Sequence, residues 1–229
     1  MCYTSDISKT SFTLSIIFFI ILFSYSFTVE DIKIKKNIYI LSTFFLFVGF
    51  MQLWDFIFWN TQDNSYKSNK INKNITKTAI IWNNIQPIVL FLLVFVINKK
   101  VSINSIIITG IFLPLFLYMT YDSINKINKT QSYNGKIIWE WNYTNYSKIF
   151  YTIFLLTFLS LFIFDIGGVI GITLSFLSTF ILLFSKYKYS VNMETGRYWC
   201  FFTSSASLII LLILLTERMI KNYSSESVE

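Results

Sequence analysis

The sequence predicts an all-α fold: a polytopic integral membrane bundle of seven transmembrane helices, forming a single domain over residues 1–229. Composition is the first reason, because 54% of the 229 residues are hydrophobic and only 14% are charged. A soluble domain averages about 25% charged residues, so this chain lacks the residues for an ordinary water-facing surface. Spacing is the second reason, since apolar windows of about 20 residues, enough to cross a ~30 Å hydrocarbon core, recur along the chain.

Each predicted span is a window of mainly apolar residues. The first window follows Asp6 and lacks the small-residue cleavage site of a signal peptide, so it is predicted to remain as a span. The fifth window is short and forms a tight hairpin with the sixth around Asp165 and Gly167–Gly168, residues that favour turns. The seven windows are 10–28, 38–60, 78–97, 101–120, 148–164, 168–185 and 198–216.

Loop charges predict the orientation of the bundle. Seven spans place the termini on opposite faces, and the loops after spans two and four, on the N-terminal face (face A), are long. Face A carries twelve Lys and Arg residues and the opposite face (face B) carries seven, so the positive-inside rule predicts a cytoplasmic N-terminus. Glycosylation sequons on face A favour the reverse orientation, although such motifs arise by chance in an asparagine-rich chain. They begin at Asn74, Asn128, Asn142 and Asn145.

A cluster of polar side chains is predicted inside the membrane, between spans two and three. Asp55 lies about five residues inside the face-A end of span two, or roughly 8 Å deep. Asn83 lies at a similar depth in span three, and Pro87 is expected to kink that span and free the Asn83 carbonyl. The amides either bind the two helices together or form a functional site around Asp55, an acid that is costly to bury. The cluster comprises Gln52, Asp55, Asn83, Asn84, Gln86 and Pro87.

Small residues on spans six and seven predict close packing between these helices. Gly and Ser let transmembrane backbones approach, because no large side chain separates them. Span six carries Gly171, Ser175 and Ser178 along one stripe, and span seven carries Ser207 near its start.

The tryptophans gather on one side of the predicted bundle, in its face-A half or in the face-A loops. They are typical of an aromatic belt at the membrane interface. The alternative is that the polar loop 139–143 folds back onto the bundle as a lid. The six are Trp54, Trp59, Trp82, Trp139, Trp141 and Trp199.

Several kinds of chemistry are excluded by residue counts. The chain has no histidine, which excludes His-ligated zinc or haem and Ser–His–Asp triads. Two cysteines are too few for a disulfide framework or a cysteine-rich metal site, so no metal and no cofactor is expected. The net charge of +7 is scattered over loops beside the spans, which favours the lipid bilayer and its anionic headgroups over nucleic acid as the partner.

Three short motifs form a recognisable set. They are Met51-Gln52-x-x-Asp55-x-x-x-Trp59, the Asn83/Asn84 pair with Gln86-Pro87, and Gly196-Arg197-Tyr198-Trp199-Cys200-Phe201-Phe202. Together they resemble an uncharacterised family of multi-pass membrane proteins of giant (nucleocytoplasmic large DNA) viruses. That family usually has Glu where this chain has Asp55. It also usually has Gly-Ser-x-Trp-Cys where this chain has Gly-Arg-Tyr-Trp-Cys, so Arg197 stands in the place of a serine. The resemblance covers about residues 38–215; it implies a viral or virally acquired membrane protein and no activity.

Three classes of function stay open. The first is a structural or interaction protein of virion or host membranes, without enzyme activity, whose partner is a second copy of itself or another viral or host membrane protein. The second is a transporter, channel or small-ligand receptor with its site between spans two and three. The third is an intramembrane enzyme using Asp55, which the sequence supports weakly because acid–base chemistry usually needs a second group.

Overall fold

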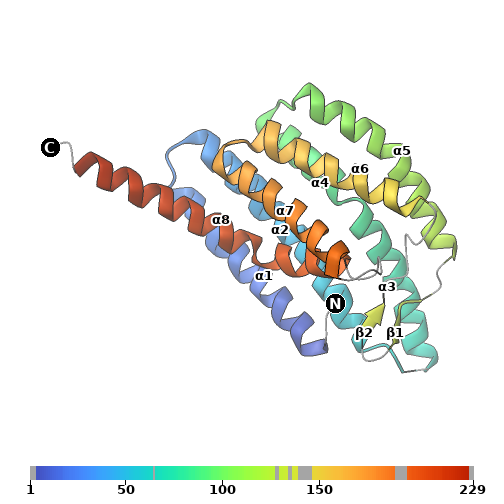
Figure 1. The fold of residues 1–229 in the computed structure, drawn as a ribbon. Helices are drawn as coiled ribbons and strands as arrows, with labels where there is room; N and C mark the ends of the chain where they lie inside the picture. The colour runs from blue at the N-terminus through green and yellow to red at the C-terminus, as the bar shows by residue number, and fades with distance from the viewer. Residues whose placement is uncertain are drawn as a thin grey trace.

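The computed structural model describes residues 4–63, 65–126, 129–133, 136–138, 146–188 and 195–226. It confirms the all-α class, with one small hairpin added in the described part of the chain (Figure 1). In chain order the elements are α1 (Ser5–Tyr25), η1 (Ser26–Thr28), α2 (Ile32–Trp59), α3 (Tyr66–Asn84), α4 (Gln86–Asn98), α5 (Ile103–Lys126), β1 (Gln131–Tyr133), β2 (Lys136–Ile138), α6 (Ser147–Ser160), η2 (Leu161–Ile166), α7 (Gly168–Lys188) and α8 (Thr195–Glu226).

Polar caps set where the first long helices begin. The side chains of Thr4, Asp31 and Ser65 accept hydrogen bonds from the first free backbone N–H groups of α1, α2 and α3. Because these caps lie outside the apolar windows, α2 begins at residue 32 rather than 38, and α3 at 66 rather than 78. The long face-A loop expected after span two is therefore mostly helix.

Membrane-length helices are present among the described residues. α3 and α4 qualify only when taken together, as two halves bent by 53°. α7 offers a shorter apolar stretch, Gly168–Ile181. By length and composition the described residues thus hold four helices able to cross a membrane, or five with the bent pair, where the sequence predicts seven spans. The four are Ser5–Thr28, Ile32–Trp59, Ile103–Lys126 and Ser147–Ile166.

The third predicted span is bent directly before Pro87, as the sequence predicts. α3 ends at Asn84 and α4 starts at Gln86, so Pro87 occupies the first turn of α4. Proline has no N–H to donate to the carbonyl four residues back, here that of Asn83, so a bend just before Pro87 is expected. The expectation of a kink in this span is therefore confirmed: the two halves meet at an angle of 53° at Ile85, two residues before Pro87. The Ile85 N–H still donates to the Ile81 carbonyl at 2.9 Å. That the Asn83 carbonyl is freed stays a prediction.

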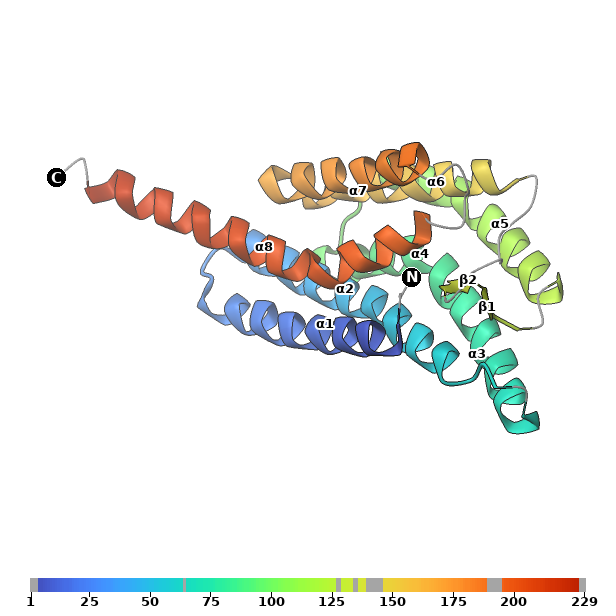
Figure 2. The same ribbon diagram turned by 60° about the horizontal axis from the view of Figure 1, so that its bottom comes forward.

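The helix α2 packs against α1, α3, α4 and α8. α1 packs along it, and α8 lies against α1, α2 and α7 (Figures 1 and 2). α5 and α6 form a second pair, which α4 connects to α2. α8 has 32 residues, about 48 Å at 1.5 Å per residue, and its C-terminal half projects beyond its neighbours.

The core of the bundle is rich in phenylalanine. Phe150, Phe154, Phe158 and Phe162 recur every four residues along α6 and η2, so they share one buried face. Successive ring centroids in this row are 5.0–5.9 Å apart, and Phe44 of α2 approaches Phe158 at 5.5 Å. The row holds the α6–η2 helix against α2.

The outward faces of the helices are also apolar. Ile103, Ile107 and Ile111 recur every four residues on α5, and each is more than half exposed. Ile172 and Phe176 are about two-thirds exposed on α7. Contiguous apolar surface of this kind is costly in water and favourable against lipid.

The turn predicted between spans five and six is confirmed. η2 is a π-helical segment that ends at Gly167, and Gly167 and Gly168 both have positive φ, at 65° and 61°. Glycine adopts this backbone without a steric penalty. The N–H of Gly167 donates to the Phe162 carbonyl at 2.9 Å, which closes the π segment.

A β-hairpin occupies part of the long loop expected after span four. β1 and β2 pair antiparallel, with Ser132 opposite Ile137. Ile137 is buried in a small second core with Met51 and Phe58 of α2. α5 also continues to Lys126, beyond the predicted end of span four at 120. The hairpin therefore lies against the face-A ends of α2 and α3.

Candidate functional site

Gln52 and Asp55 lie on the inner face of α2. Their three-residue spacing puts them on one side of the helix, and Gln52 is 2% and Asp55 0% exposed. Both residues interact with other residues. A fully buried carboxylate needs such partners, because it has lost its hydration shell. The structure thus places the predicted acid inside the bundle.

The asparagine pair at the end of α3 connects to α5. Asn83 Nδ2 donates to Asn84 Oδ1 at 3.1 Å, and Asn84 Nδ2 donates to Thr120 Oγ1 at 3.1 Å. All three side chains are buried. Sequence reasoning considered only spans two and three and missed Thr120, which is 36 residues from Asn84. The asparagine pair therefore joins α3 to α5, and α3 as a whole also packs on α2.

Gln86 and Pro87 open α4 directly after the break. Both are buried, and Gln86 interacts with other residues. The break therefore gathers two asparagines and one glutamine within four consecutive positions of the chain. Polar groups at a helix break are tolerated at membrane depth where protein covers them.

An aromatic contact joins α2 to α3 beside this cluster. The indole N–H of Trp82 donates to the Phe47 carbonyl at 2.8 Å, and the two rings stack with centroids 4.2 Å apart. Trp54 meets Trp82 edge-on at 5.8 Å. These two tryptophans line the contact between α2 and α3. The lid alternative depends on 139–143, which lies outside the described residues.

A second polar network, on face A, was not predicted. Asn72 is its centre: Nδ2 donates to the Thr130 carbonyl (3.0 Å) and to Thr61 Oγ1 (3.2 Å), while Oδ1 accepts from the Thr130 N–H (2.9 Å). The hydroxyls of Thr76 and Thr130 lie 2.8 Å apart, and all four residues are buried. The network ties the hairpin segment to α2 and α3. The i, i+4 spacing of Asn72 and Thr76 is the one sequence signal that could have pointed to it.

A third polar contact lies at the opposite end, on face B. Asp165 Oδ1 accepts from the backbone N–H of Ser102 at 2.7 Å, and Oδ2 accepts from Ser105 Oγ at 2.5 Å. Ser102 directly precedes α5, so the carboxylate stabilises the positive end of that helix. Asn37 Nδ2 donates to the Ile166 carbonyl at 3.0 Å, which links the same turn to α2. The sequence predicts Asp165 only as a turn residue. In the structure it also joins the α4–α5 hairpin to the η2–α7 hairpin.

The four predicted packing residues are all buried, and α7 and α8 are in contact. The hydroxyls of Ser175 and Ser178 donate to carbonyls one turn back in α7, so they need no partner across the contact. Gly171 lies against the backbone of η2, where an added Cβ would collide with the Phe162 carbonyl oxygen. Gly171 therefore closes the hairpin between η2 and α7, while Ser207 lies on α8.

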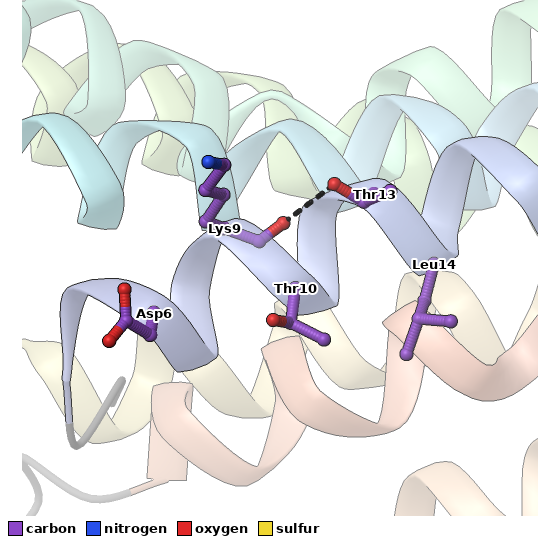
Figure 3. A pocket seen from close by; sticks show the side chains of 5 residues that line it. All are labelled: Asp6, Lys9, Thr10, Thr13 and Leu14. Carbon is purple, nitrogen blue, oxygen red and sulfur yellow. Dashed lines mark hydrogen bonds between the residues drawn. The ribbon is translucent and has the colours of Figure 1, made fainter.

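An open surface hollow of about 430 Å³ lies along the start of α1. Figure 3 shows Lys9 pointing away from Thr10 and Leu14, and the Thr13 hydroxyl bonded to the Lys9 carbonyl (3.0 Å). Asp6 also lines the hollow. The five side chains come from one helix and do not converge on a point, so the hollow has no organised polar site.

Metal ligands and known relatives give no further guidance. Among the described residues, no group of three or more His, Cys, Asp or Glu side chains is placed to hold a metal ion. Comparison of the chain with protein-family models, with curated proteins and with solved structures gives no match.

Proposed function

We propose that this chain is a seven-span integral membrane protein with a structural or interaction role, and that its buried polar cluster joins helices. One observation carries the proposal: polar side chains at membrane depth are buried within the bundle, while the outward helix faces are apolar. That inside-out distribution suits lipid as the solvent. α7 and α8 supply the sixth and seventh spans in this proposal, and face A is cytoplasmic.

Topology can be tested by cysteine labelling. Cys2 and Cys200 are first replaced by Ser, and single cysteines then replace Lys67 on face A or Lys99 on face B. In sealed vesicles a membrane-impermeant maleimide should label only one of the two positions before permeabilisation. Labelling of both positions from the same side would contradict an arrangement with five or seven spans.

The role of the cluster can be tested by ion and proton flux. The native protein and Asp55→Asn are reconstituted in liposomes at matched insertion. Helix joining predicts no flux from either protein and a shift only in resistance to unfolding, because the amide keeps the size of the carboxylate and changes its charge.

A transporter, channel or small-ligand receptor is the second candidate. Asp55 favours it, since an ionisable residue buried in a membrane span commonly marks a substrate or ion path. Flux through the native protein that disappears in Asp55→Asn would establish this second function and reject helix joining as the sole role.

The membrane in question is proposed from the motifs alone. The resemblance of Gln52, Asp55 and the Gln86-Pro87 pair to the viral family supports a virion or host membrane. Immunogold labelling of infected cells and purified virions would test that location, and its absence from both would reject a viral origin.

A further inference from the structure

α3 carries a row of four lysines on its outer face. Lys67, Lys70 and Lys73 are exposed and Lys77 is half-buried. At 100° per residue the four fall within an arc of about 120°. The opposite side of the helix carries Asn72, whose network attaches α3 to the rest of the protein. The lysines are therefore free to face an outside partner without disturbing that attachment.

The lysine row does not stabilise α3 itself. Residues 65–98 contain no Asp or Glu, and within the described part of the chain no lysine of α3 forms an ion pair. Lys67 lies in the first turn, where the helix dipole disfavours a positive charge. Lysines three and four residues apart also repel one another. Asp63, just before the helix, is the nearest acid in sequence. An external anion would relieve this repulsion.

The row continues directly into lipid-facing surface. Ile81 lies four residues after Lys77 on the same stripe and is 42% exposed. Ten residues separate Lys67 from Lys77, about 15 Å along α3. Because α3 is bent by 53° from α4, those 15 Å correspond to about 9 Å along the axis of α4, the more apolar half of the bent pair. A headgroup layer is roughly 5–8 Å thick on each face, so the row is matched to its depth.

We propose that Lys67, Lys70, Lys73 and Lys77 bind the headgroups of anionic phospholipids in the face-A leaflet. Lysine suits this role because its stem lies along apolar surface while the ammonium reaches the phosphate layer. Lys129 adds a fifth positive charge, since its Nζ donates to Asn69 Oδ1 of α3 at 3.2 Å. The proposal rests on the proposed membrane insertion and names the lipid class for it.

Native mass spectrometry of the full chain in detergent micelles tests the proposal. Phosphatidylserine or phosphatidylcholine is titrated in, and bound lipids are counted. Phosphatidylserine should bind in preference, and its apparent affinity should fall about tenfold or more in the substituted protein. A matched variant removes four lysines from face B and should bind as the native chain does. The two variants are Lys67→Gln/Lys70→Gln/Lys73→Gln/Lys77→Gln and Lys33→Gln/Lys35→Gln/Lys36→Gln/Lys99→Gln.

Further variants keep the outcome decisive. Arginine at all four positions should retain binding, since the charge is kept. If the fourfold glutamine variant does not fold, the exposed pair Lys67→Gln/Lys70→Gln should still lower the affinity about threefold. Unchanged binding, an equal loss in the face-B variant, or equally tight binding of glycerophosphoserine without acyl chains would overturn the proposal. Failure of membrane insertion would appear in the labelling experiment instead, because this titration needs no bilayer.

Discussion

Replacing Gly171 by alanine tests the closest backbone approach described in the bundle. Gly171 lies in the first turns of α7, and an added Cβ would meet the Phe162 carbonyl oxygen of η2. That oxygen already accepts the Gly167 N–H at 2.9 Å. A backbone carbonyl in a hydrogen-bonded π turn cannot swing aside as a flexible side chain can. The hairpin between η2 and α7 must therefore open to admit one methyl group.

The expected magnitude comes from a matched pair of substitutions. Gly110, on the exposed side of α5, has nothing within 4 Å of a built Cβ, so Gly110→Ala should gain up to about 1 kcal/mol of helix propensity. Gly171→Ala has at most the same gain and adds an overpacking cost of about 1–3 kcal/mol. Gly171→Ala should therefore be less stable than Gly110→Ala by roughly 1–3 kcal/mol.

Unfolding by sodium dodecyl sulfate in mixed micelles measures this difference, with far-ultraviolet circular dichroism as the signal. Both variants are compared with the native chain at the same detergent ratio. Equal unfolding midpoints for Gly171→Ala and Gly110→Ala would refute the close approach of α7 to the Phe162 carbonyl.

Three further substitutions test the other contacts. The double variant Asn72→Ala/Thr76→Val should speed hydrogen exchange at the Thr130 amide by at least about tenfold, because that N–H loses both of its buried acceptors and an unsatisfied buried donor costs about 1–3 kcal/mol. Unchanged exchange would show that the network does not hold the hairpin. Asp165→Ala should lower stability by about 1–3 kcal/mol in the same detergent assay, because the α5 terminus loses its acceptor; a neutral result would remove that role. Gly49→Ala should destabilise the packing of α1 on α2, because the added Cβ would lie 2.8 Å from the Ser15 Cβ. The double variant Gly49→Ala/Ser15→Gly should regain stability in the same detergent assay. A double variant no more stable than Gly49→Ala would show that Ser15 is not the residue that clashes.

Local sequence features predicted the helices well but not their ends. Hydropathy located each apolar window, and the turn at Gly167 followed from glycine chemistry. Hydropathy, however, marks only the apolar part of a helix, whereas the helix itself begins at its N-terminal cap. Ser65 starts α3 well before the apolar window because its side chain accepts the Ser68 N–H at 3.2 Å. The long amphipathic part of α3 was therefore taken for a loop.

The polar contacts were predicted as residue types but not as partners. Asp55, Asn83 and Asn84 are buried as expected, yet Asn84 bonds to Thr120 on α5. Asn72 bonds to Thr130, 58 residues away. No spacing rule along the chain reaches such distances, because which helices become neighbours depends on the whole bundle. A threonine in an apolar window also looks like any other small residue until its partner is known.

The attachment of α5 shows why these hydroxyls matter in lipid. Apolar burial cannot distinguish inner from outer helix faces when the solvent is itself hydrocarbon, so packing and hydrogen bonds must do so. Of the six buried residues on α5, four are Ser or Thr. Ser105 bonds to Asp165 at one end and Thr120 to Asn84 at the other. The rotation of α5 about its axis is therefore set by hydroxyl contacts near both ends, and its isoleucine row is left exposed on the outside of the bundle.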